Sequence, residues 1–238
     1  MGRAAVVHGR RSRTQSLAGM VYEDLKADIL ALRIEPGTSL DKAELCLRFG
    51  TSRSPINEAI LQLSLEGLVD LVPQSGSYVS RLSVPAIAEG VFLREAIEVA
   101  AAIHVADEAD PHVLRGLRRN IAMQELLAAD GDQDGLHDMD KALHALILEA
   151  TGHPSILDVA ADVGLRLERA RRLALPARER AADLVQEHRE IVEAVARGDH
   201  KEIRHAMTTH LRRLNERIGP VVERLPHYFK IESQRRPS

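Results

Sequence analysis

The sequence has very few of the residues that build disulfides, thiolate metal sites or aromatic-rich sheets. Its 238 residues include one cysteine, Cys46, no tryptophan, three tyrosines and three phenylalanines. One cysteine can form neither an intramolecular disulfide nor a cysteine-based metal cage. Strands favour aromatic and β-branched side chains, whereas alanine, leucine, arginine and glutamate are plentiful here. The composition therefore predicts a mainly α-helical protein.

Long apolar runs and a strong net charge are also missing. No stretch approaches the ~20 apolar residues that a transmembrane helix needs, and no apolar segment follows the first arginines as it would in a secretory signal. The formal net charge is -3, so the overall charge does not indicate a nucleic-acid partner. Hydrophobic residues at 45% and charged residues at 28% are typical of a soluble globular chain. We expect a cytoplasmic protein without a membrane partner.

The chain begins with a basic segment, for which we expect a flexible arm over residues 1–16. A terminal segment of this kind is more often flexible than bound to a DNA groove or to phosphates, and both interpretations stay open. Four arginines precede the first acidic residue, and they are Arg3, Arg10, Arg11 and Arg13.

Residues 17–82 begin with the pattern of two helices. Apolar positions at helical spacing predict a first helix over 17–32, which ends before a Pro-Gly turn. A short second helix begins at Asp41, and Gly50 closes it. A tight turn would then lead from the second helix into a third helix.

A third helix and a hairpin follow. Either Ser52 or Ser54 can cap the amino end of this helix, and Gly67 is its expected stop. Two short runs that are typical of strands, 69–72 and 78–80, flank a segment rich in turn residues. Three helices and a hairpin in this order predict a winged helix-turn-helix with a small β-hairpin wing.

From residue 83 to residue 225 the pattern changes to long helices. Prolines and glycines separate the predicted helices, which are 84–108, 111–129, 135–151, 155–175, 178–197 and 200–222. Helices of these lengths bury a sizeable core, so we expect an antiparallel bundle of six to seven helices in residues 83–225. Residues 226–238 are expected to form a frayed tail.

Several short motifs in the first half carry a family resemblance. They are Val21-Tyr22-Glu23-Asp24-Leu25, Ile34-Glu35-Pro36-Gly37, the run from Leu45 to Pro55, Glu66-Gly67-Leu68-Val69 and Gly76-Ser77-Tyr78-Val79. In combination they resemble the DNA-binding domain of the GntR family of bacterial transcription regulators. The resemblance implies a homodimer that places the third helix of each subunit in a major groove of double-stranded DNA. A twofold protein of this kind would read an inverted-repeat operator.

The third helix offers side chains that suit such a contact. Arg53 lies at its amino end, where a guanidinium can bond guanine through two hydrogen bonds. Ser52, Ser54 and the first N–H groups of the helix suit phosphate oxygens. Further candidates for backbone contact are Lys42 and Arg48 on the second helix and Gly76 at the wing tip.

Asn57 departs from the family pattern, which usually has a second arginine four residues after the first. Asparagine can pair with adenine through two hydrogen bonds, so the change suggests an altered operator preference. The alternative is that Asn57 simply faces solvent.

Three histidines and an aspartate lie on apolar faces of the predicted helices. His188 and His210 each interrupt an aliphatic stripe, and Asp140 precedes His144 by one turn. An aspartate and a histidine at this spacing can grip one ion between them. A single buried histidine is more often a hydrogen-bonded core residue, whereas several polar groups converging from three helices favour a divalent cation. The spacing alone leaves both interpretations open.

Motifs around these residues carry a second resemblance. They are Asp140-Lys141-Ala142-Leu143-His144, Glu187-His188-Arg189-Glu190-Ile191, Gly198-Asp199 and His210-Leu211. They resemble the FCD effector-binding domain of the FadR subfamily within the GntR family. The resemblance implies that Asp140, His144, His188 and His210 hold a divalent metal ion such as Zn, Ni or Mn. Such a ligand set leaves coordination positions open for water or an effector carboxylate.

Arg94 and Glu98 match an Arg-x-x-x-Glu pattern on the first helix of such domains. A guanidinium that faces the cavity would clamp an effector carboxylate, and the alternative is an i, i+4 salt bridge on a solvated face. His137 shares the face of the Asp140 motif and is expected to support the site at most. His153 stands where the family often has asparagine.

The sequence thus predicts a dimeric, ligand-responsive transcription repressor and not an enzyme. A small organic acid that binds at or beside the metal would shift the affinity for the operator. One alternative is a metal-dependent hydrolase or isomerase with an accessory DNA-binding domain, since an ion with open positions can activate water. Another is a purely structural ion. The sequence has no Walker loop, G-x-S-x-G elbow, H-E-x-x-H helix or G-x-G-x-x-G turn, which favours the regulator.

Overall fold

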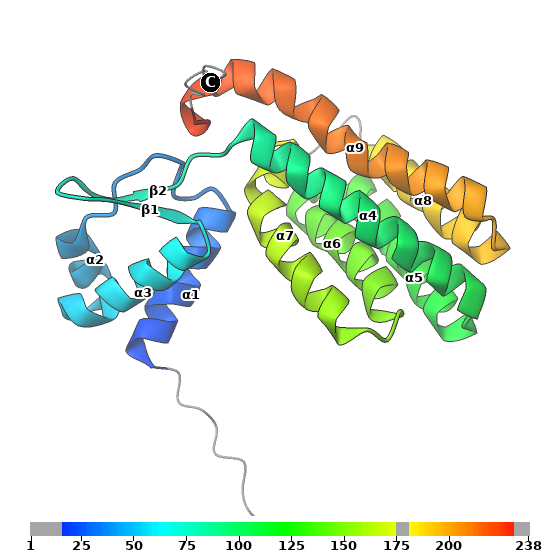
Figure 1. Cartoon of the computed structure of the whole chain (residues 1–238), viewed down its shortest axis with the longest axis horizontal. Helices are drawn as coiled ribbons and strands as arrows, with labels where there is room; N and C mark the ends of the chain where they lie inside the picture. Colours follow the sequence, from blue (N-terminus) through cyan, green and yellow to red (C-terminus); the bar gives the residue numbers. More distant parts are fainter. Residues whose placement is uncertain (1–15, 175–180, 231–238) are drawn as a thin grey trace, which may run out of the picture. The chain divides into compact units, whose positions relative to one another are not determined.

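A computed structural model describes residues 16–174 and 181–230 of the chain (Figure 1). These residues divide into two compact units, each of which is mainly helical. One unit holds the described residues up to Ile29 together with Thr38–Ser80, and the other holds Leu30–Gly37 and the described residues from Arg81 onward. The arginines of the predicted basic arm lie outside the described residues.

The first unit is the predicted winged helix-turn-helix (Figure 1). Its elements are α1 (Leu17–Leu30), α2 (Lys42–Phe49), α3 (Arg53–Leu65), β1 (Val69–Val72) and β2 (Gly76–Val79). Asp41 caps α2 by accepting hydrogen bonds from two main-chain N–H groups, and Gly50 ends the helix with a left-handed φ of 60°. The two strands pair antiparallel, with Val69 opposite Val79.

Two boundaries in this unit differ from the prediction. The first helix ends at Leu30, and Leu32 has a φ of 60°, so it does not continue the apolar stripe that was predicted through residue 32. The second strand covers 76–79 instead of 78–80 because its pairing with β1 begins directly after the turn. The core of the unit includes the buried residues Val21, Leu25, Ile29, Ile56, Ile60 and Leu63.

The second unit is a bundle of long helices. They are α4 (Val84–Glu108), α5 (Pro111–Asp130), α6 (Gln133–Glu149), α7 (Pro154–Leu173), α8 (Ala181–Arg197) and α9 (His200–Arg224). Prolines open α5 and α7, where a missing N–H group costs nothing, and Gly131 and Gly198 follow α5 and α8 with left-handed φ values. Within the described ranges, the membrane-span criterion of length and apolarity is met by none of the helices.

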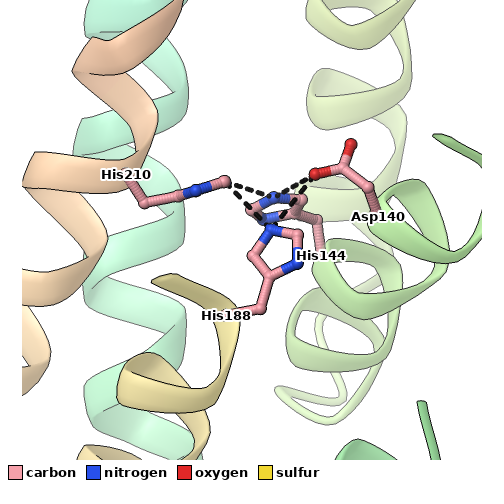
Figure 2. A group of neighbouring side chains, drawn as sticks. All are labelled: Asp140, His144, His188 and His210. Carbon is pink, nitrogen blue, oxygen red and sulfur yellow. Dashed lines mark hydrogen bonds and ion pairs between the residues drawn. The ribbon is translucent and has the colours of Figure 1, made fainter. Parts of the chain in front are cut away.

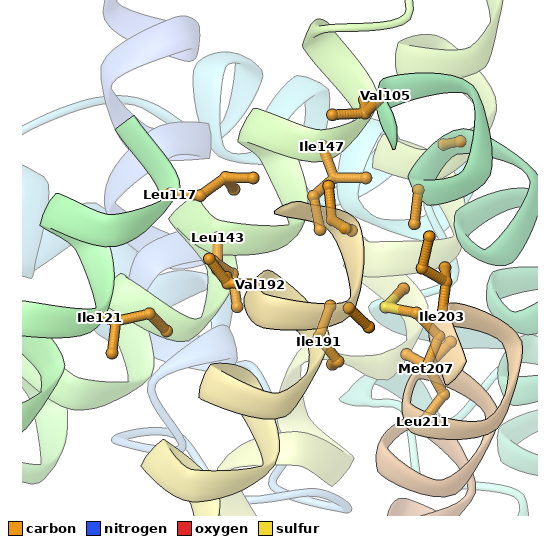
Figure 3. Close-up of a cluster of buried hydrophobic side chains, with 14 of the residues drawn as sticks. Val105, Leu117, Ile121, Leu143, Ile147, Ile191, Val192, Ile203, Met207 and Leu211 are labelled. Atoms are coloured by element: carbon orange, nitrogen blue, oxygen red, sulfur yellow. The ribbon is translucent and has the colours of Figure 1, made fainter. Parts of the chain in front are cut away.

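An aliphatic core joins the helices of the bundle (Figure 3). Helix α4 packs along α9, α5 packs against α6 and α8, and α8 packs against α9. Each fully buried aliphatic side chain contributes about 1.5–3 kcal/mol relative to exposure. Members of the core include Val105, Leu117, Leu143, Ile147, Ile191, Ile203 and Met207. This packing fixes the faces of α6, α8 and α9 that point toward one another.

The end of the chain is more ordered than predicted. A 3-10 helix, η2 (Pro226–Tyr228), follows α9, and the side chains of Tyr228 and Phe229 are buried. The main-chain N–H of Leu82 donates to the carbonyl of Tyr228 at 2.9 Å. The prediction of a frayed tail is therefore wrong for residues 226–230, because two aromatic side chains find an apolar site there.

A buried carboxylate ties α6 to α7. One oxygen of Glu168 lies 2.8 Å from Nε2 of His137 and 3.4 Å from Nζ of Lys141. Nε of Arg172 lies 3.5 Å from the same oxygen. Burial alone would raise the pKa of Glu168, but His137 and the nearby cations outweigh it and lower this pKa to about 2. The carboxylate therefore stays ionised and joins the two helices.

We predict that Glu168→Gln lowers the free energy of unfolding by roughly 3 kcal/mol at pH 7, because it removes the charged partner that His137 and Lys141 share in a buried site. Because the folded-state pKa lies below the ordinary value of 4.5, this stability is present above about pH 4.5 and is lost as the pH falls toward 2. Urea unfolding in the presence of a chelator, repeated from pH 7 downward, measures the difference between variant and wild type. The exposed Glu149→Gln is the control, and a difference for Glu168→Gln that does not shrink with falling pH contradicts the account.

Candidate functional site

Four polar side chains converge inside the bundle (Figure 2). Asp140 and His144 lie one turn apart on α6, His188 comes from α8, and His210 comes from α9. All four are buried, with at most 8% of any residue exposed. One nitrogen or oxygen atom from each lies within 4.8 Å of those of the other three. The structure thus brings together the four residues that the sequence proposed as metal ligands.

The converging atoms are the Nε2 atoms of the histidines and Oδ1 of Asp140. Nε2 of His210 lies 3.1 Å from Nε2 of His144 and 3.3 Å from Nε2 of His188. Oδ1 of Asp140 lies 3.2 Å from Nε2 of His188 and 3.7 Å from Nε2 of His144. Donor atoms bound at ~2.0–2.2 Å to one ion lie about 3 Å apart, so the spacing fits a single divalent cation.

The other ring nitrogen of each histidine faces a side-chain oxygen. The Nδ1–oxygen pairs are His144 with Glu98 at 2.6 Å, His188 with Gln124 at 2.6 Å and His210 with Glu187 at 2.9 Å. The hydrogen bonds to Gln124 and Glu187 place the ring protons of His188 and His210 on Nδ1 and leave their Nε2 lone pairs facing the centre, whereas His144 forms an ion pair with Glu98. Lone pairs of these nitrogens and of the carboxylate oxygen would repel one another at such distances unless a cation lies among them. The donor set therefore fits a metal ion.

Burial and charge favour the protonation states that a metal requires at three of the four donors. Burial lowers the pKa of His188 and holds that of His210 well below its ordinary value, so both rings stay neutral. Burial opposes ionisation of Asp140, but the guanidinium of Arg171 outweighs it and keeps the pKa of this carboxyl well below its ordinary value. Burial also acts to lower the pKa of His144, but Glu98 outweighs it and raises this pKa.

Arg171 of α7 holds the outer oxygen of Asp140. Its guanidinium donates to Oδ2, while Oδ1 faces the histidines. Asp140 therefore offers a single oxygen to the centre of the cluster. Arg171 could not be identified from the sequence, because an arginine among several others near the end of a helix gives no distinguishing signal.

Arg94 and Glu98 are buried, with 8% and 3% of each residue exposed. They bond each other at 2.6 and 3.3 Å, so the predicted i, i+4 salt bridge is present but does not lie on a solvated face. Burial would raise the pKa of Glu98, but Arg94 and His144 outweigh it and lower this pKa to about 2. Glu98 therefore links the guanidinium to a histidine of the cluster.

A small cavity lies beside the four donors. Its volume is about 50 Å³, roughly the space of one or two water molecules and enough for a carboxylate group. Guanidinium groups next to a metal site suit a carboxylate ligand. The cavity is lined by Asp140 and His210 and by four arginines, Arg94, Arg171, Arg213 and Arg217.

Two other histidines from the sequence analysis lie outside the group of four. His137 is fully buried but is bonded to Glu168, and it contributes no donor atom to the cluster. His153 is exposed at the N-cap position of α7, with its ring 5.9 Å from that of His104. Neither is part of the candidate metal centre.

Gln124 and Glu187 contact the histidines and were given no role from the sequence. Gln124 could have been found, because it and Asn120 stand one turn apart on the buried face of α5 that also carries Leu117 and Ile121. Polar amides on a buried face call for specific partners. Glu187 precedes His188 directly, and only the packing of α8 against α9 shows that it meets His210 instead.

The predicted base-reading residues are exposed in the first unit. Arg53 is the first residue of α3, and Ser54 and Asn57 are also exposed along this helix. Ser52 occupies the N-cap position, but its side chain makes no capping hydrogen bond. The first N–H groups of α3 and the Ser52 hydroxyl thus lie at one exposed helix end, which suits an anionic phosphate.

The remaining residues predicted to contact the DNA backbone are exposed as well. Lys42 begins α2, and Gly76 begins β2 with a φ of 140°, a conformation that other residues rarely adopt. The guanidinium of Arg48 is paired with Asp28 of α1 and lies 4.9 Å from the ring centre of Phe49. A phosphate contact by Arg48 would compete with this ion pair.

Comparisons with known proteins match both units. The model of the family described as bacterial regulatory proteins, gntR family, matches residues 17–79, and the FCD domain model matches residues 89–213. The chain is 34% identical to an HTH-type transcriptional regulator in an unstable DNA locus of Streptomyces ambofaciens, over 96% of this chain and 94% of that protein. It is 28% identical to the HTH-type transcriptional repressor RspR of Escherichia coli K12, over 92% and 96%. The solved structure of E. coli McbR/YncC has the same fold, with a TM-score of 0.69 at 18% identity over 88% and 98%.

Elemental analysis of the purified protein tests the four donors. We expect the wild type to retain a divalent metal near one equivalent and the double variant His188→Ala/His210→Ala to lose it, because two of four ligands are gone. His104→Ala/His153→Ala removes two histidines outside the cluster and should leave the metal content unchanged. Stoichiometric metal in the folded His188/His210 variant would exclude this assignment.

Proposed function

The chain belongs to the GntR family of bacterial regulatory proteins and carries an FCD domain, and on this premise we propose that it is a transcription repressor whose operator affinity is controlled by a small organic acid bound at or beside a divalent metal. Regulation of transcription follows from the family and from relatives that are transcriptional regulators. The repressor role is supported by the name of RspR. The hydrolase or isomerase alternative finds no counterpart among these relatives.

The observation that carries the metal part of the proposal is the convergence of four donor atoms. Asp140, His144, His188 and His210 would hold the ion, for which Zn, Ni and Mn are the candidates. When bound, the ion would supply positive charge and open coordination positions for an anionic ligand. Oxygen partners at all three Nδ1 atoms hold the rings in the required orientation.

The charges around the cavity support an anionic effector. The three carboxylates are Glu98, Asp140 and Glu187, and the four guanidiniums are those of Arg94, Arg171, Arg213 and Arg217. These side chains pair with one another, and Glu216 also pairs with Arg213, so a divalent ion would add two positive charges in excess. A carboxylate that binds here lowers the cost of burying this excess charge.

The first unit would bind DNA as one half of a homodimer on an inverted repeat. Arg53 and Asn57 would contact base edges, while Ser52, Ser54 and the first N–H groups of α3 would bind phosphate. The other backbone contacts would come from Lys42, Arg48 and Gly76.

Control of DNA binding requires that the effector bind the DNA-competent and DNA-incompetent arrangements with different affinities. Arg94 lies in the cavity on α4, the helix that follows residues 81–83 directly in the chain. We expect residues 81–86 to transmit a conformational change of the bundle to the DNA-binding unit.

Arg53→Ala should reduce the affinity for the operator by about 1–3 kcal/mol and relax the sequence preference at one base pair of each half-site. Arg48→Ala is the matched comparison, because loss of a phosphate contact should weaken binding to specific and random duplexes alike and reduce the salt dependence by about one ion. Fluorescence anisotropy with operator and scrambled duplexes measures both. Unchanged operator affinity in folded Arg53→Ala protein rejects its role.

The effector part is tested by thermal shift with a panel of mono-, di- and tricarboxylates. At least one acid should raise the melting temperature of the metal-loaded protein and change operator binding, and chelation of the metal should weaken both effects. Equal responses with and without metal would place the acid elsewhere. If the metal stabilises the fold but no acid changes the melting temperature or the operator binding, the ion is structural.

A further inference from the structure

Two amides on α5 form a buried chain of hydrogen bonds that ends at His188. Asn120 is 7% exposed and Gln124 is fully buried. Nδ2 of Asn120 donates to the main-chain carbonyl of Met139 at 3.0 Å, and Nε2 of Gln124 donates to Oδ1 of Asn120 at 2.6 Å. Oε1 of Gln124 lies 2.6 Å from Nδ1 of His188. These hydrogen bonds form a relay that runs from the backbone of α6 through Asn120 and Gln124 of α5 to His188 of α8.

The main-chain carbonyl of Met139, where the relay starts, fixes the orientation of both amide groups. A carbonyl oxygen can only accept, so Asn120 must turn its NH2 group toward Met139 and its oxygen toward Gln124. For the same reason Gln124 must donate to Asn120 and present its own oxygen to His188. The ring proton of His188 therefore lies on Nδ1, and its Nε2 lone pair faces Asp140 and His210.

His188 differs from the other two histidines in the nature of its partner. His144 and His210 face carboxylates, and both oxygens of a carboxylate accept hydrogen bonds, so the partner works in either orientation. An amide has one accepting oxygen. If Gln124 turned over, its NH2 group would face Nδ1, the proton would move to Nε2, and this nitrogen could not bind a metal.

We propose that Gln124 and Asn120 are positioning residues that set the tautomer of His188 and thereby the affinity of the cluster for its metal ion. The inference rests on the metal site proposed above. The relay begins at the carbonyl of Met139, directly before Asp140, so α6 supplies both one ligand and the group that orients another. The relay thus couples the positions of α6 and α8 through α5.

The test measures the zinc affinity of the full-length protein by competition with a chelator. Gln124→Leu removes the acceptor and should weaken zinc binding about 10–100-fold, the usual effect of losing a partner of a metal-bound histidine. Gln124→Glu keeps an acceptor for Nδ1 of His188 but can no longer donate to Asn120, so it should bind zinc more tightly than Gln124→Leu. The exposed Gln186→Leu on α8 is the matched control and should have no effect.

Asn120→Ala leaves Gln124 in place but removes the group that orients it, and it should weaken zinc binding in the same direction. It also keeps the proposal testable if Gln124→Leu does not fold. Nitrogen-15 NMR of the zinc-free protein supplies a second readout, since His188 should carry its proton on Nδ1 in the wild type and populate the other tautomer in Asn120→Ala.

The outcomes separate this inference from the proposed function. A wild type that binds no zinc at the four donors overturns the metal site, and the relay with it. Tight zinc binding by the wild type together with unchanged affinity and tautomer in folded Asn120→Ala and Gln124→Leu overturns the relay alone.

Discussion

The bundle holds within 4.8 Å of one another three histidine nitrogens and a carboxylate oxygen whose lone pairs would repel one another without a cation. The Nε2 atoms of His144 and His188 lie 3.1 and 3.3 Å from that of His210, and Asp140 adds a carboxylate oxygen. A buried site surrounded by aliphatic side chains screens such repulsion poorly. The arrangement is maintained from outside, because acceptors on α4, α5 and α8 hold the far side of each ring. A cation among the four donors would convert this repulsion into coordination.

Two arginines next to the four donors bear on the binding of both a metal ion and an anion. Arg171 takes the outer oxygen of Asp140, and Arg94 reaches His144 through Glu98, so two guanidiniums lie next to the donors. A metal ion and an anionic effector would then bind next to each other, and each would increase the affinity for the other. A regulator built in this way would respond to its effector more strongly in the metal-loaded state.

Local chemistry made much of the fold predictable. Prolines and glycines mark where α5, α7 and α8 begin or end, and the aliphatic stripes place His188 and His210 inside the bundle. The four donors came from spacing together with a family resemblance. The apolar face of α5 indicates that Gln124 is a buried amide in need of a partner, but the order of residues does not show that this partner is His188 or that Arg171 meets Asp140. The burial of Tyr228 was missed for the same reason.

The central claim is that three imidazoles and one carboxylate of the bundle bind a single metal ion. Diffraction from crystals of the protein soaked in zinc, recorded on both sides of the zinc absorption edge, tests it most directly. The account predicts one anomalous peak at ~2.0–2.2 Å from Oδ1 of Asp140 and from Nε2 of His144, His188 and His210. A peak elsewhere, or the four side chains with no peak among them, would contradict it.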